Sequence, residues 1–146
     1  MSDAGAPSNA GARPTTYWDS SALIEACTFA DLRRRLSVER GLTRRHALAE
    51  TFSTLTGKAH LKVSANTAAA LLESLTQHLE FVELSTDDYL QAAKAAESAG
   101  IRGGAIHDWL HARAAIKAEA RKFLTLDAND FSRLLPATIP VEVPAD

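Results

Sequence analysis

Apolar residues follow two different periods along this chain. Short runs of β-branched and aromatic residues, typical of buried strands, alternate with longer stretches in which apolar residues return every three or four positions, as in amphipathic helices. The predicted strands are residues 15–18, 81–84 and 123–126, with an edge strand in the proline-containing tail 139–144. The predicted helices are residues 20–29, 32–40, 47–55, 65–79, 87–99 and 105–117. Residues 42–46 fit either a loop or a short strand.

Capping and breaking residues set the expected helix ends. Ser20 or Ser21 is expected to cap the first helix and Asp31 the second, because short polar side chains satisfy the free amides of a first turn. Gly41 is expected to end the second helix. Strands separated by helices need crossover connections, which join parallel strands. The sequence therefore predicts an α/β fold, a three-layer α/β/α sandwich with a central parallel β-sheet.

Length and composition suit one globular domain: the chain has 146 residues, of which 46% are hydrophobic and 23% charged. We place the domain at residues 15–146. Residues 1–14 are rich in Ala, Gly, Ser and Pro, and predict a disordered leader without the apolar segment of a secretory signal. No run of about 18 apolar residues occurs, so we expect no transmembrane helix. The single Cys27 fits helix packing better than catalysis, and we expect a cytoplasmic protein.

Charge is unevenly distributed along the chain, although its net value is only −2. Residues 31–62 carry eight basic and three acidic side chains, whereas residues 73–97 carry six acidic and one basic. A basic segment on a mildly acidic protein suits a polyanionic partner such as RNA. A solvated helix face explains the same charges equally well.

Asp19 occupies the position on which the functional interpretation depends. It follows the predicted strand 15–18 and precedes a predicted helix, so its carboxylate lies at the carboxyl end of a strand, where open α/β sheets bind ligands. A plain helix cap explains a single acid at this position as well.

Three further acids share an apolar or small-residue context with Asp19: Glu50, Asp108 and Asp127. Acids are rarely buried unless they are paired or bind metal. Four carboxylates at one rim of a sheet would repel one another, and a divalent cation removes that conflict. Hard oxygen ligands select Mg²⁺ or Mn²⁺.

Four segments around these acids resemble the motifs of PIN-domain ribonucleases, most closely the VapC-type toxins of toxin–antitoxin pairs. The segments are residues 19–23 (DSSAL), 49–50 (AE), 104–108 (GAIHD) and 125–131 (TLDANDF). The resemblance covers about residues 16–131, and its order and spacing make it specific. It implies an α/β/α fold with a parallel sheet and metal-dependent endoribonuclease activity on RNA. For the toxins it also implies a cognate antitoxin and a homodimer.

The resemblance assigns roles to individual residues. It makes the four acids Asp19, Glu50, Asp108 and Asp127 the metal-binding and catalytic set, with Mg²⁺ or Mn²⁺ as cofactor. Supporting polar positions match Ser20, Ser21 and Thr125, and Asp130 competes with Asp127 as the fourth ligand. The chain departs from the family pattern at Arg45, His46 and Arg113.

Two other interpretations stay open. His107, Asp108 and His111 resemble the His-Glu-x-x-His motif of zinc proteases, although Asp replaces Glu and no third ligand follows. A non-catalytic RNA- or antitoxin-binding module with the same fold is the main alternative to an enzyme. It differs from the nuclease in that it would bind RNA without cleaving it.

Overall fold

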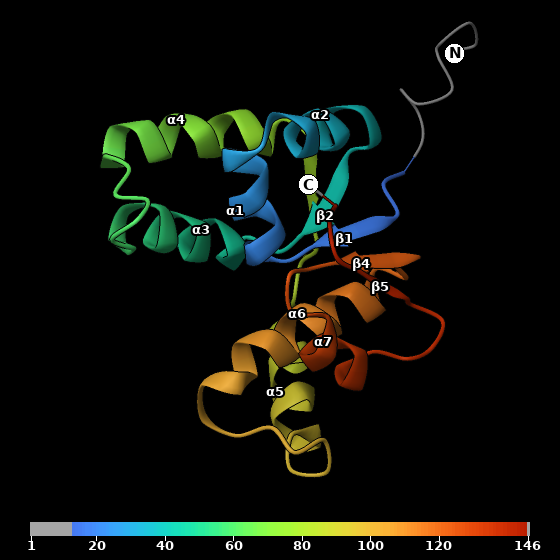
Figure 1. Cartoon of the computed structure of the whole chain (residues 1–146). Coiled ribbons are helices and arrows are strands. Elements are labelled where there is room, and N and C mark those ends of the chain that lie inside the picture. Colours follow the sequence, from blue (N-terminus) through green and yellow to red (C-terminus); the bar gives the residue numbers. More distant parts are fainter. Residues whose placement is uncertain (1–12, 146) are drawn as a thin grey trace, which may run out of the picture.

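The computed structural model describes residues 13–145 (Figure 1). Residues 1–12, most of the predicted leader, lie outside the described residues. In the described part, the central sheet has the strand order β3-β2-β1-β4-β5, and every pairing in it is parallel. The strands are β1 (Thr16–Trp18), β2 (Gly41–Thr43), β3 (Leu79–Phe81), β4 (Lys122–Leu124) and β5 (Val141–Glu142).

Helices cover both faces of this sheet. The helices are α1 (Ser20–Thr28), α2 (Ala30–Glu39), α3 (His46–Gly57), α4 (Ala65–Thr76), α5 (Thr86–Ala95), the short 3-10 helix η2 (Gly103–Ala105), α6 (Ile106–Lys117) and α7 (Ala128–Leu134). Helices α1–α4 lie on one side and α5–α7 on the other (Figure 1). The predicted three-layer α/β/α sandwich with a parallel sheet is therefore confirmed.

The central strand β1 divides the core into two parts. Successive side chains of a strand point to opposite faces, and here Trp18 packs with the apolar residues of α1, α2 and α4, whereas Tyr17 packs with those of α5–α7. Neighbouring β4 repeats the division, with Phe123 on the Tyr17 side and Leu124 on the Trp18 side. The Tyr17 and Phe123 rings stack with centroids 5.1 Å apart. One three-residue strand thus organises both cores.

Two predicted strands are shifted in the structure. The strand predicted at residues 81–84 corresponds to β3, which begins at Leu79 instead. The reason is that β3 pairs in register with β2 from Gly41↔Leu79 to Thr43↔Phe81. After the end of β3, the Val82 amide donates a hydrogen bond to the Thr43 carbonyl at 2.7 Å. The strand predicted at residues 123–126 ends at Leu124. In both cases the partner strand, rather than the apolar run, sets the limits.

Both expected ends of helix α2 are wrong. Helix α2 already begins at Ala30, so Asp31 lies in its first turn and pairs with Arg34 (3.2 Å) instead of capping. Gly41 does not end α2 but begins β2, and Arg40 has a positive φ (61°) at the helix end. The ambiguous segment 42–46 is divided between β2 and the start of α3.

The longest helices of the described part have 12 residues. None of the helices in residues 13–145 is long and apolar enough to cross a membrane.

Gly41 is expected to be intolerant of a side chain. A Cβ there would lie 2.7 Å from Trp18 Cδ1 and 2.9 Å from Leu36 Cδ1, both in the buried core. We expect Gly41→Ala to lower the free energy of unfolding by about 1–3 kcal/mol through overpacking, measured by urea denaturation. Gly57→Ala is the matched control, because nothing lies within 4 Å of its added Cβ. A Gly41→Ala protein as stable as the control would contradict the tight packing.

The edge strand β5 is held by Glu142, whose carboxylate accepts from Arg35 at 2.7 and 3.1 Å and contacts Lys122 at 3.0 Å. The Arg35 hydrogen bonds lower the Glu142 pKa from its ordinary value of 4.5 to about 2. This contribution to stability is therefore complete above pH 4.5 and is lost as the pH falls towards 2.

We expect Glu142→Gln to lower the free energy of unfolding at pH 7 by about 1 kcal/mol, because solvent screens this partly exposed cluster. The variant should also lose part of the acid sensitivity between pH 4.5 and 2, measured by denaturation at several pH values. The exposed Glu97→Gln serves as control. Equal pH profiles for wild type and Glu142→Gln would exclude this role.

Candidate metal centre at the carboxyl edge of the sheet

Asp19 is both a helix cap and a buried carboxylate. It directly follows β1 and is 4% exposed. Its Oδ1 accepts hydrogen bonds from Ser21 Oγ (2.6 Å) and the Ala22 amide (3.0 Å), and its Oδ2 accepts from Thr125 Oγ1 (2.6 Å). Burial raises the Asp19 pKa, and these hydrogen bonds oppose the shift. Asp19 itself therefore caps α1, and the expectation that Ser20 or Ser21 caps this helix is wrong.

Ser21 and Thr125 tie the end of β4 to the start of α1. Ser21 Oγ also accepts from the Leu126 amide (3.0 Å), and Thr125 Oγ1 accepts from the Asp127 amide (3.0 Å). The two hydroxyls lie 3.3 Å apart. These contacts place Asp127, which precedes α7, on the same edge of the sheet as Asp19.

Asp108 lies in the first turn of α6 and is partly buried. Its pKa is raised by burial and by the negative charges of Asp19, Asp127 and Asp130, while the charge of His111 opposes the shift. Asp130 is exposed and pairs with Arg133 at 3.3 Å. Two of the other predicted acids, Asp19 and Asp127, therefore act electrostatically on Asp108.

Glu50 reaches this edge from α3 and is held by a buried histidine. His111 Nε2 lies 2.8 Å from Glu50 Oε1, and His111 Nδ1 lies 2.8 Å from the Tyr17 hydroxyl. Burial raises the Tyr17 pKa, so the phenol keeps its proton.

His111 is buried, with an exposed fraction of only 1%. The signal that could have revealed its position is its spacing: His111 follows Asp108 by one helical turn within the apolar face of α6. His107, in contrast, is exposed and stacks on His46, with ring centroids 5.5 Å apart. The two histidines of the zinc-protease interpretation therefore contact different partners.

Arg44 brings a buried positive charge close to Glu50. It is 4% exposed, and its guanidinium donates to the His107 carbonyl at 3.4 Å. The Glu50 pKa is lowered overall: burial raises it, but the hydrogen bond and charge of His111 lower it, and the charges of Arg44 and His46 act in the same direction. Glu50 is thus kept ionised.

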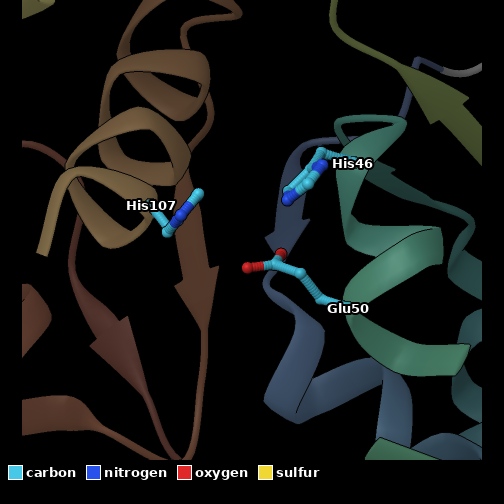
Figure 2. A group of neighbouring side chains, drawn as sticks. All are labelled: His46, Glu50 and His107. Atoms are coloured by element: carbon cyan, nitrogen blue, oxygen red, sulfur yellow. The ribbon is translucent and has the colours of Figure 1, made fainter. Parts of the chain in front are cut away.

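A second grouping involves Glu50 and two residues from outside the predicted set. His46, Glu50 and His107 can each offer a ligand atom within 4.8 Å of the other two, and they converge from α3 and α6 (Figure 2). They border an open cavity of about 480 Å³, which Ser20, Ser53 and Thr54 also line. Among residues 13–145, no three of the four predicted acids approach one another this closely.

The basic segment 31–62 is largely engaged within the protein. Arg34 pairs with Asp31, Arg35 with Glu142, and Arg45 with Glu83. These contacts support the interpretation of the segment as a structural and solvated surface. They leave less positive charge for RNA than the sequence suggested.

No model of a known protein family matches this chain, and no curated protein matches it.

The hydrogen bond between Tyr17 and His111 is expected to stabilise the fold. We expect Tyr17→Phe to lower the free energy of unfolding by about 1–3 kcal/mol, because it leaves the buried His111 Nδ1 without a partner. Chemical denaturation measures this. Tyr89→Phe, at a position that is 45% exposed, should change stability by less than about 0.5 kcal/mol. Equal effects of the two substitutions would rule out the buried hydrogen bond.

Proposed function

We propose that this protein is an endoribonuclease that hydrolyses RNA phosphodiester bonds with Mg²⁺ or Mn²⁺. The observation that carries the proposal is the environment of Asp108, whose pKa is raised by burial and by the negative charges of neighbouring acids. Those acids lie where parallel strands end, which is the usual ligand site of open α/β sheets. Opposed carboxylates are hard oxygen donors, and such a donor set fits a Mg²⁺-class cation.

In this proposal the ion is held by Asp19, Glu50, Asp108 and Asp127, with Asp130 beside them. The chemistry that such an ion supplies when bound is activation of water and neutralisation of the phosphate under attack. The protein's own residues orient the donors. Ser21 and Thr125 fix the Asp19 carboxylate through short hydrogen bonds (2.6 Å each), and His111 fixes Glu50 at 2.8 Å.

We further propose the role of a VapC-type toxin, with a cognate antitoxin as partner, a homodimer as its assembled form and the cytoplasm as its location. The support for the role, the antitoxin and the homodimer is the resemblance of the four motifs, quoted above, to that family. Growth arrest on induced expression, relieved by the product of a neighbouring reading frame, is the outcome expected of a toxin. Normal growth with full RNA cleavage would indicate RNA processing instead.

Removal of either the metal or one acid is expected to stop cleavage. We expect Asp108→Asn and Asp19→Asn each to reduce Mg²⁺-dependent RNA cleavage by on the order of 100-fold or more, because each removes several kcal/mol of transition-state stabilisation. EDTA should abolish the cleavage and added Mn²⁺ restore it. Gel assays on a labelled RNA pool measure the rates.

Asp87→Asn is the matched control, because Asp87 is an exposed first-turn acid of α5 that does not belong to the proposed site. Full activity of Asp108→Asn would contradict the assignment of the site. RNA that binds wild type and Asp108→Asn equally, without cleavage by either protein, would identify a non-catalytic binding module.

A further inference from the structure

We propose that a divalent transition-metal ion of the zinc class binds between His46, Glu50 and His107. Each residue offers one ligand atom, and these three atoms all lie within 4.8 Å of one another. Small side-chain rotations can therefore bring all three atoms into contact with one ion. The three side chains converge in Figure 2 from two helices on opposite sides of the sheet. None of the four motifs contains His46, so this site is distinct from the four-acid set, with which it shares Glu50.

The donor types select the class of metal. Imidazole nitrogen suits Zn²⁺ and its transition-metal neighbours, whereas Mg²⁺ prefers oxygen ligands and keeps much of its water. Two histidines and one carboxylate are a known ligand set for Zn²⁺ with an open fourth position. The open cavity of about 480 Å³ beside the three residues provides space for that fourth ligand.

The backbone arrangement places the three ligands well. His46 and Glu50 are four residues apart on α3, so their side chains share one helix face. His107 lies in the first turn of α6. The backbone carbonyl of His107 accepts a hydrogen bond from the buried Arg44. Both histidines are exposed, and in the described part their ring nitrogens have no hydrogen-bond partner that would compete with a metal.

Glu50 also has the support that metal-binding carboxylates usually need. His111 engages Oε1 at 2.8 Å and is itself fixed by the Tyr17 hydroxyl at 2.8 Å, so the carboxylate is oriented by a buried chain of hydrogen bonds. Within residues 13–145, Oε2 has no hydrogen-bond partner and is available to an ion. Outer contacts of this kind are typical of metal ligands.

Sharing Glu50 has a consequence for activity, and this consequence alone rests on the proposed nuclease function. An ion held by the two histidines takes up the carboxylate that the four-acid set also needs. We therefore expect Zn²⁺ to inhibit Mg²⁺-dependent cleavage, and His46→Gln to relieve the inhibition.

Binding is tested on the full chain without an affinity tag, at pH 7.5, where imidazoles are mostly neutral. We expect one Zn²⁺ per chain by isothermal titration calorimetry, and a Co²⁺ absorption spectrum typical of nitrogen and oxygen ligands. His46→Gln and His107→Gln should each weaken Zn²⁺ binding by on the order of 10–100-fold. Millimolar Mg²⁺ should not displace the ion.

His60→Gln is the matched control, because His60 is exposed and lies between α3 and α4. It should bind Zn²⁺ like wild type. Absence of stoichiometric binding at micromolar Zn²⁺, or unchanged affinity in both the His46 and the His107 variants, would overturn the proposed site. Zn²⁺ binding with these variant effects, in a protein that does not cleave RNA, would uphold the site and refute only the nuclease function.

Discussion

The buried carboxylate of Asp19 is the constraint on which the edge of this sheet depends. A carboxylate at 4% exposure must have its oxygens satisfied. Three donors satisfy them: the Ser21 hydroxyl, the Ala22 amide and the Thr125 hydroxyl. These donors come from α1 and from the residue after β4, so one side chain joins β1, the following helix and the neighbouring strand. The loops around Asp127 take their position from this junction, because their amides bond to the same two hydroxyls.

A second buried chain, from Tyr17 through His111 to Glu50, connects the opposite helical layers. Tyr17 belongs to β1, His111 to α6 and Glu50 to α3, which lie in three different layers of the sandwich. One chain starts from Tyr17 within β1 and the other from Asp19, which directly follows that strand. The central strand therefore positions the acids more directly than any loop does. Polar groups held in this way by rigid elements are what a catalytic or metal-binding centre requires.

Glu50 is the residue that the two proposed metal sites share. The proposed four-acid set offers an ion oxygen atoms only, whereas His46 and His107 beside Glu50 offer nitrogen. The charges of Arg44 and His46 help to keep it ionised, and His111 limits its orientation. A single carboxylate in this position can serve a hard or a borderline cation, depending on which neighbours share the ion.

The sequence alone indicated the layer architecture, because alternating strand and helix periods favour parallel strands with crossovers. It also indicated that Asp19 and Asp127 follow strands, because each comes after an apolar run. It could not determine the strand limits, since β3 and β4 end where their partners do. Tertiary structure alone decided that Thr125 donates to Asp19, that His111 is buried against Tyr17, and that His46 faces His107. The physical reason is that these contacts join residues from 61 to 106 positions apart, whose pairing depends on how helices pack across the sheet and leaves no local pattern in the sequence.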